Sequence, residues 1–215
     1  MRNDLLFLAT VVLSSCNLYI LATSRLTSLV KTVAIQGIIL AFVPVLTPDA
    51  PDVLHAVILT ATSLVVKGVL IPHFLLRAMR GVNIPREPDP PVGYSMSLLF
   101  GIVTTGLSFY LVRHIPFGSV VVSPLHAGLA IGTACTGIFL ISARRRAINQ
   151  VIGYLIFENA AYLLGISIAA HQPLLVEMGV LLDMMVGVFI MGVMIYRINT
   201  EFDSISTTQL ERLKL

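Results

Sequence analysis

Long apolar runs separated by short polar connections fill nearly the whole chain. Each run has about 20 residues, the length that an α-helix needs to cross the hydrocarbon core of a bilayer. The connections are a few residues long, except for a Pro-rich and charged stretch at Arg80–Gly93. The pattern predicts an all-α, polytopic membrane protein with seven transmembrane helices: Leu5–Ala22, Leu29–Leu46, Val53–Leu76, Tyr94–Val112, Ser119–Ala143, Ile148–Ala170 and Leu174–Tyr196.

Composition leads to the same class of protein. Hydrophobic residues make up 56% of the chain and the mean hydropathy is +0.91, both far above the values of soluble globular domains. Seven helices leave no room for a soluble catalytic domain, so any soluble chemistry must belong to another chain. Cys16 and Cys135 lie inside predicted helices, and an iron–sulfur cluster needs about four thiolates. We therefore expect no redox active site, metal or cofactor in this chain.

The basic residues predict how the helices are oriented. Eleven of the fourteen lie on one side of the predicted bundle, in alternate connections and after the last helix. By the positive-inside rule, the N-terminus is then outside the cell and the C-terminus inside. The basic pI of about 9.1 is an effect of this topology, so we expect a lipid bilayer and no nucleic acid as the partner.

A weak internal repeat suggests three parts. Residues 1–93 hold three helices and the Pro-rich cytoplasmic loop, 94–112 a connecting helix, and 113–215 a second three-helix unit with a cytoplasmic tail. With the connecting helix between them, the second three-helix unit starts on the same side of the membrane as the first. Helices one to three and helices five to seven are then parallel copies. Superposing the copies brings Gln36 within one position of Glu158.

Three ionisable residues lie near the middle of predicted spans: Lys67, Glu158 and Asp183. Each charge at the bilayer centre costs about 2.5–3.5 kcal/mol on insertion scales, so such residues are retained mostly for function. Lys67 is too far from either helix end for its ammonium to reach the interface, so it must face the bundle or a partner subunit. We interpret the three as stations for a proton or small cation. The alternatives are a fixed ion pair and neutral polar contacts between helices.

Several polar residues are secondary candidates for the same pathway. Tyr154 and Tyr162 share a helix face with Glu158, and Asn159 lies beside it. Glu177 follows Pro173 and fits an interfacial or capping role better. The remaining candidates are Gln36, His73, which follows a predicted kink at Pro72, and His126, for which a hydrogen-bonded core histidine is the better interpretation.

The second half resembles the K-type subunit of respiratory complex I and the C-type subunit of Mrp cation/proton antiporters. The similarity runs through Leu140–Arg145, Val151–Ala160 and Asp183–Val188. In the K-type pattern a glutamate directly follows Ile-Gly-Leu, whereas here the acid comes one helical turn later, at Glu158. Asp183, followed by Gly after four residues, fits the second K-type glutamate with Asp in place of Glu.

The whole chain resembles the hydrogenase-4 component E family, found in membrane-bound group 4 nickel–iron hydrogenase and formate hydrogenlyase-type complexes of prokaryotic inner membranes. The resemblance implies a multi-pass, non-catalytic subunit of a complex I-like oxidoreductase. Its partners would be antiporter-like membrane subunits, a quinone- or hydrogenase-module membrane anchor, and soluble hydrogenase or formate dehydrogenase subunits. Nickel–iron and iron–sulfur centres would lie in those partners.

For the buried charges, the resemblance implies that Lys67, Glu158 and Asp183 take part in proton or Na⁺ movement. This movement would be coupled to redox energy released in the partner subunits. The displaced glutamate leaves open whether the subunit moves ions or only completes the membrane arm. A standalone proton-coupled transporter also remains open. A retinal protein resembling the microbial family would carry its lysine in the last helix and would need an aromatic pocket. Here Lys67 is in the third predicted helix and the chain has no Trp, so this class is disfavoured.

Overall fold

The computed structural model describes residues 2–46, 57, 60–61, 63–80, 91–114, 124–144 and 146–168. In this part of the chain the elements are all helical. They are α1 (Arg2–Ala22), α2 (Leu26–Leu46), the π-helix η1 (Val66–Leu70), α4 (Ile71–Arg80), α5 (Tyr94–His114), α6 (Pro124–Ala143) and α7 (Ala147–Ile168). The all-α prediction is confirmed for these residues. The predicted seventh helix, with Glu177 and Asp183, lies outside them.

Four of the described helices are long and apolar enough to cross a membrane, namely Asp4–Ala22 in α1, Leu26–Val43 in α2, α5 and α6. The count of seven spans, the topology and the internal repeat remain predictions, as do the boundaries of the three predicted units. The helix boundaries follow the apolar runs closely. At the start of α6, Pro124 takes the first helical position, where its missing N–H costs no hydrogen bond.

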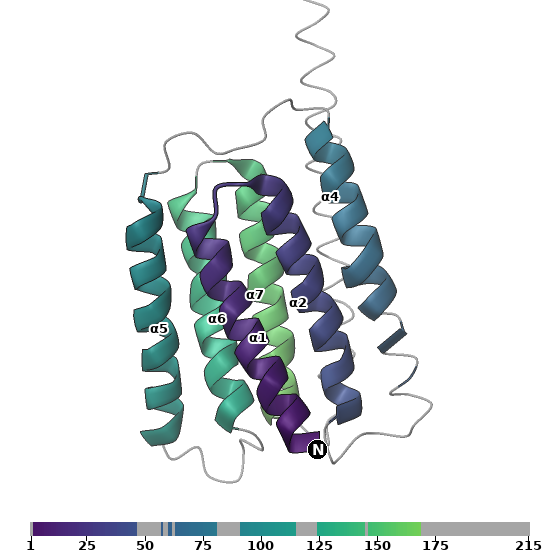
Figure 1. The fold of residues 1–215 in the computed structure, drawn as a ribbon, viewed down its shortest axis with the longest axis vertical. Coiled ribbons are helices and arrows are strands. Elements are labelled where there is room, and N and C mark those ends of the chain that lie inside the picture. Colours follow the sequence, from purple (N-terminus) through teal and green to yellow (C-terminus); the bar gives the residue numbers. More distant parts are fainter. Residues whose placement is uncertain are drawn as a thin grey trace, which may run out of the picture.

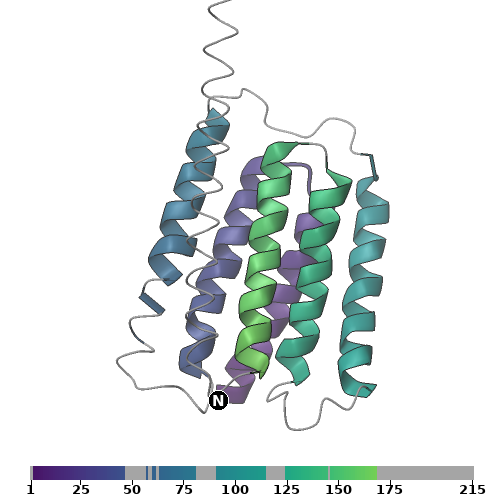
Figure 2. The ribbon, with the colours of Figure 1, turned by 180° about the vertical axis from the view of Figure 1, so that it is seen from behind.

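The helices lie side by side in a bundle whose long axes are nearly parallel (Figures 1 and 2). Helices α1, α2, α6 and α7 form the centre, with α5 at one edge beside α1 and α6, and η1 and α4 at the other edge beside α2. Two apolar clusters fill the interior: one is centred on Leu21, Leu29 and Ile152, and the other on Leu40 and Leu129.

The backbones of α6 and α7 are in direct contact at two glycines. A Cβ atom on Gly137 would lie 2.7 Å from the carbonyl oxygen of Gly153, and one on Gly153 would lie 2.8 Å from the carbonyl oxygen of Gly137. No larger residue fits at this crossing without moving a helix. Such small-residue contacts are typical of helix packing in membranes, where burial of apolar surface does not drive association.

The surface of α5 is apolar on the side that faces away from the bundle. Its exposed side chains include Met96, Leu99, Ile102, Val103 and Leu107. An exposed apolar stripe of this length is unfavourable in water and favourable against lipid tails or another membrane subunit.

Arg144 joins the start of α5 to the end of α6. Its buried guanidinium donates hydrogen bonds to the carbonyl oxygen of Val92 at 3.2 Å and to Oγ of Ser97 at 3.3 Å. It also lies 4.7 Å from the ring centroid of Tyr94. These contacts satisfy a charge that would otherwise be costly to bury.

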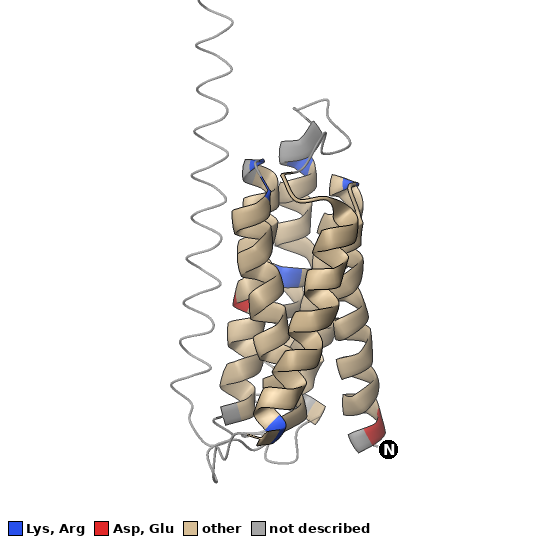
Figure 3. Cartoon of the chain, turned by 90° about the vertical axis from the view of Figure 1, so that its left-hand side faces the viewer, with Lys and Arg blue, Asp and Glu red and all other residues tan. Residues whose placement is uncertain are grey.

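The charged residues of the described part are unevenly distributed. Most Lys and Arg positions lie at the end of the bundle opposite the N-terminus, while Asp4 follows the N-terminus in α1 (Figure 3). Lys67 and Glu158 are instead buried inside the bundle, where their side chains are paired and form the candidate site.

Candidate functional site

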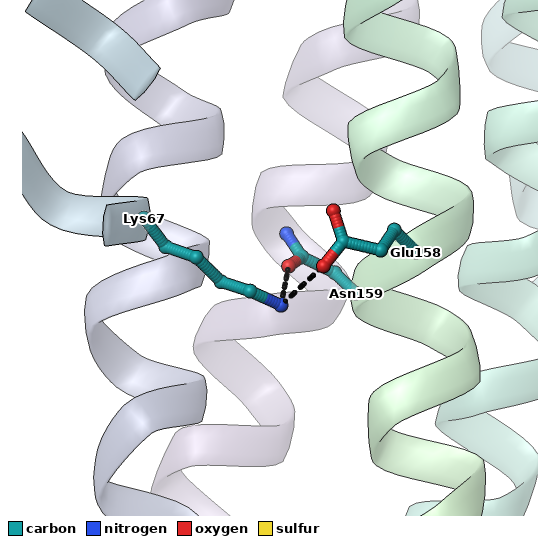
Figure 4. A network of polar contacts seen from close by, with 3 residues as sticks. All are labelled: Lys67, Glu158 and Asn159. Carbon is teal, nitrogen blue, oxygen red and sulfur yellow. Dashed lines mark hydrogen bonds and ion pairs between the residues drawn. The ribbon is translucent and has the colours of Figure 1, made fainter. Parts of the chain in front are cut away.

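Lys67 and Glu158 form an ion pair inside the bundle. The ammonium nitrogen Nζ of Lys67 lies 2.8 Å from Oε1 of Glu158, and the two side chains are only 7% and 2% exposed. Nζ also donates a hydrogen bond of 3.2 Å to Oδ1 of Asn159 (Figure 4). The structure thus joins two of the three predicted midplane charges, which come from η1 and α7.

The local backbone of Lys67 is unusual. Lys67 lies in the π-helix η1, where the N–H of Ile71 donates to the carbonyl oxygen of Val66, five residues earlier. Pro72 follows immediately; it has no N–H to donate to Gly68, and its ring would clash with that carbonyl in a regular α-helix. A wider turn relieves this clash, so the kink predicted at Pro72 takes the form of a π-turn that contains the lysine.

A glycine on α2 makes room for this segment. A Cβ atom on Gly37 would lie 2.7 Å from Cβ of Lys67, and backbone atoms of Lys67 would lie 3.5 and 3.6 Å away. The backbone of α2 therefore passes directly beside Lys67. Gly37 lets the lysine stem pass α2 and reach α7.

Two neutral groups of α7 also contact the ammonium of Lys67. Oδ1 of Asn159 accepts its hydrogen bond, and the ring centroid of Tyr162 lies 4.9 Å from Nζ, within the range of a cation–π interaction. Tyr162 also interacts with the side chain of Ser63, which precedes η1. Of the stripe predicted on this helix, Glu158, Asn159 and Tyr162 meet at Lys67, whereas Tyr154 packs against the apolar cluster around Ile152.

The carboxylate of Glu158 is only partly satisfied. Its contact with Lys67 is an ion pair rather than a well-directed hydrogen bond, and Oε2 has no hydrogen-bond partner in the described part of the chain. A buried carboxylate oxygen without a partner is costly. The group can therefore gain stability from a proton, a water molecule or a second cation.

A second polar cluster was only partly anticipated from the sequence. Nε2 of Gln36 donates to Oδ1 of Asn17 at 2.8 Å, and Nδ2 of Asn17 donates to Oγ1 of Thr133 at 2.7 Å. The Thr133 hydroxyl donates in turn to the carbonyl oxygen of Leu129 at 2.8 Å. Gln36 was a candidate, but Asn17 and Thr133 were missed because uncharged residues give little signal within an apolar run. This chain of hydrogen bonds joins α2, α1 and α6.

The two histidine candidates differ. His126 is buried, as predicted, but neither ring nitrogen has a hydrogen-bond partner among the described residues, in contrast to the hydrogen-bonded core histidine that we expected. His73 is exposed on α4, with its ring against that of Phe74, and does not join the Lys67 site. Glu177 and Asp183 lie outside the described residues, so their roles stay predictions.

The described residues contain no group of three or more His, Cys, Asp or Glu side chains that could hold a metal ion. The ion pair between Lys67 and Glu158 offers charge and proton chemistry. Because one partner is a base and the other an acid, a proton added to Glu158 or removed from Lys67 breaks the ion pair in either case. The arrangement is suited to coupling proton transfer to a change in contacts.

Long apolar helices around a buried Lys–Glu pair are typical of a membrane protein with a charged interior, and the described part of this chain is helical. Sequence comparison then identifies relatives. Hydrogenase-4 component E of Escherichia coli K12 is 26% identical over 163 residues, 72% of each chain, and the protein of the same name in Shigella flexneri matches equally. The uncharacterized protein Rv0085 of Mycobacterium tuberculosis is 25% identical over 192 residues, 88% of this chain and 86% of its own.

These matches support the resemblance to hydrogenase-4 component E inferred from the sequence, as a distant relationship. No family model matches the chain. No solved structure matches it either.

Proposed function

We propose that this chain is an integral membrane subunit of a complex I-like respiratory or hydrogenase complex, and that its buried charged groups take part in proton or Na⁺ translocation coupled to redox chemistry in partner subunits. The observation that carries the proposal is the enclosed ion pair between Lys67 and Glu158. The distant similarity to hydrogenase-4 component E supports the kind of complex.

The contacts of Lys67 support a proton-driven change at this site. When a proton reaches Glu158, the carboxyl becomes neutral and its attraction for the ammonium is lost. Oδ1 of Asn159 and the ring of Tyr162 then remain as neutral partners that can hold the charged lysine. The ammonium thus gains freedom to interact with a further carboxylate, for which Asp183 is the candidate. Coulomb interactions between such groups are strong at low dielectric, so each protonation changes the next.

The proposed setting is the inner membrane of a prokaryotic cell, with the N-terminus outside and the C-terminus inside. The gathering of basic residues at the end of the bundle opposite the N-terminus supports this orientation. The apolar outer face of α5 would contact lipid or a neighbouring antiporter-like subunit. Other partners would be the quinone- or hydrogenase-module anchor and the soluble hydrogenase or formate dehydrogenase subunits, which would carry the nickel–iron and iron–sulfur centres.

Glu158→Gln tests the proposal, because glutamine keeps the size and hydrogen-bonding capacity of the side chain but cannot ionise. We expect the complex to assemble, dye-linked redox activity to persist, and redox-coupled proton uptake to fall. Glu201→Gln, the same chemical change in the predicted tail, is the control and should leave uptake unchanged. If Glu158→Gln changes neither uptake nor redox activity, a structural role for the subunit replaces ion transfer.

A further inference from the structure

The ammonium of Lys67 occupies a set of groups that would suit a free monovalent cation. Its nitrogen Nζ lies 2.8 Å from Oε1 of Glu158 and 3.2 Å from Oδ1 of Asn159, and the ring centroid of Tyr162 is 4.9 Å away. Carboxylate and amide oxygens bind metal cations, and aromatic faces attract positive charge. Figure 4 shows the two oxygen atoms on one side of this nitrogen. The cation that they bind here is part of the chain itself.

The packing of the bundle holds this ammonium in place. A Cβ atom on Gly37 would lie 2.7 Å from Cβ of Lys67, so α2 passes directly against the lysine stem. Only 7% of the Lys67 side chain and 2% of the Glu158 side chain are exposed. A cation that displaced the ammonium from Glu158 would leave a positive charge in the apolar interior without this carboxylate, which is strongly unfavourable. Because the ammonium is tethered, it also competes with any free cation at a high effective concentration.

Na⁺ and a proton make different demands on the pair. Na⁺ needs oxygen ligands that replace its water shell, and both Oε1 of Glu158 and Oδ1 of Asn159 already contact Nζ. Adding Na⁺ beside the ammonium would place two like charges a few ångströms apart, where their repulsion at low dielectric is strong. A proton needs only one carboxylate oxygen, and Oε2 of Glu158 has no hydrogen-bond partner in the described part of the chain. The pair can therefore accept a proton without losing the lysine from the site.

We propose that Lys67 restricts the Glu158 site to protons, because its tethered ammonium occupies the place that Na⁺ would need. The inference rests on the proposed function, in which it narrows the ion handled by this subunit to the proton. The ammonium leaves the carboxylate only after a proton has neutralised it, so no step offers Na⁺ a charged and vacant Glu158. Lys67 thus determines which ion the site accepts.

The unfolding temperature of the purified complex tests whether Na⁺ binds at Glu158, since a ligand of the folded protein raises it. It would be measured in NaCl and in choline chloride of equal ionic strength. Wild type and Glu158→Gln should show the same difference between the two salts, because Na⁺ sites in partner subunits contribute equally to both. A rise in Na⁺ that is present in the wild type and lost in Glu158→Gln overturns the proposal.

Lys67→Gln tests whether the ammonium is what excludes Na⁺. The substitution removes the positive charge and offers an amide oxygen beside the carboxylate of Glu158. Na⁺ should then raise the unfolding temperature by about 2 °C or more beyond its effect on the wild type. Adding Glu158→Gln should abolish this extra rise. If Lys67→Gln responds to Na⁺ no more than the wild type does, the proposal is overturned. The comparison of wild type with Glu158→Gln needs no change at position 67, so it decides even where Lys67→Gln lowers the yield.

The proposed function and this inference fail on different results. If Glu158→Gln leaves redox-coupled proton uptake unchanged, the proposed function fails, whereas the salt comparison still decides whether the pair excludes Na⁺. If proton uptake falls in Glu158→Gln but Na⁺ stabilises the wild type through Glu158, the subunit takes part in ion transfer without selecting protons, and only this inference fails.

Discussion

Gly37 lies directly against Lys67: a Cβ atom on the glycine would come within 2.7 Å of Cβ of the lysine. Real Cβ atoms do not approach so closely, so even one added methyl group must displace α2 or η1. The absence of a side chain at position 37 is therefore a condition for the position of the ammonium at Glu158.

Gly37→Ala should consequently weaken both folding and function. Overpacking a close helix contact typically costs about 1–3 kcal/mol, and here the displaced atoms belong to the segment that carries Lys67. We expect a lower thermal unfolding temperature of the purified complex and reduced coupled proton uptake. Gly106→Ala is the matched control, because a Cβ atom on Gly106 meets nothing within 4 Å. If both variants unfold at the same temperature, the contact at Gly37 is looser than the geometry indicates.

The Lys67–Glu158 pair predicts a non-additive double mutant. Lys67→Met leaves the buried carboxylate without its counter-ion, and breaking a buried pair by removing one partner typically costs about 3–5 kcal/mol. Adding Glu158→Gln removes the remaining charge and should restore much of the lost stability. Complex yield and unfolding temperature of the wild type, both single variants and the double variant measure this coupling. Coupled proton uptake should stay below the wild-type rate in Lys67→Met and also in the double variant.

The sequence predicted most helix boundaries well, because they are set by the length of apolar runs. Helices α2 and α7 end or begin within about three residues of the predicted positions, and α1 ends at Ala22 as expected. Helix α6 is described from Pro124 to Ala143 and ends where predicted, while the predicted residues 119–123 lie outside the described residues.

The site was harder to predict because its contacts depend on packing. Lys67 and Glu158 were found individually, since a charge within an apolar run is a strong signal. An ion pair of Lys67 was among the alternatives, but the sequence did not identify Glu158 as its partner, because helix order along the chain does not determine which helices touch. Asn17 and Thr133 are uncharged, so they hardly change the hydropathy of the apolar runs that contain them and were not identified as candidates. The π-turn at Lys67 was suggested only indirectly, by Pro72.

The orientation in the membrane can be tested by labelling. Cysteines placed at Asp52 and His171 should react with an impermeant thiol reagent in intact cells, while cysteines at Arg86 and Arg145 should react only after the cells are opened. The background needs Cys16→Ala and Cys135→Ala to exclude native thiols. Labelling of Arg145→Cys from outside would reverse the predicted orientation, and labelling of only one of Asp52→Cys and His171→Cys would change the number of spans.

The last prediction concerns Asp183, which we propose to be energetically coupled to Lys67 through Glu158. Three ionisable groups at one depth of a bundle reduce their cost by sharing a polar layer, and the structure already joins two of them. Lys67→Ala alone leaves two carboxylates to repel each other, whereas combining it with Asp183→Asn removes one of these charges. The double variant should therefore give a higher complex yield than Lys67→Ala alone, with coupled activity measured across the full cycle. Strictly additive effects would mean that Lys67 and Asp183 act apart, and a relay from Glu158 would then have to continue through a partner subunit.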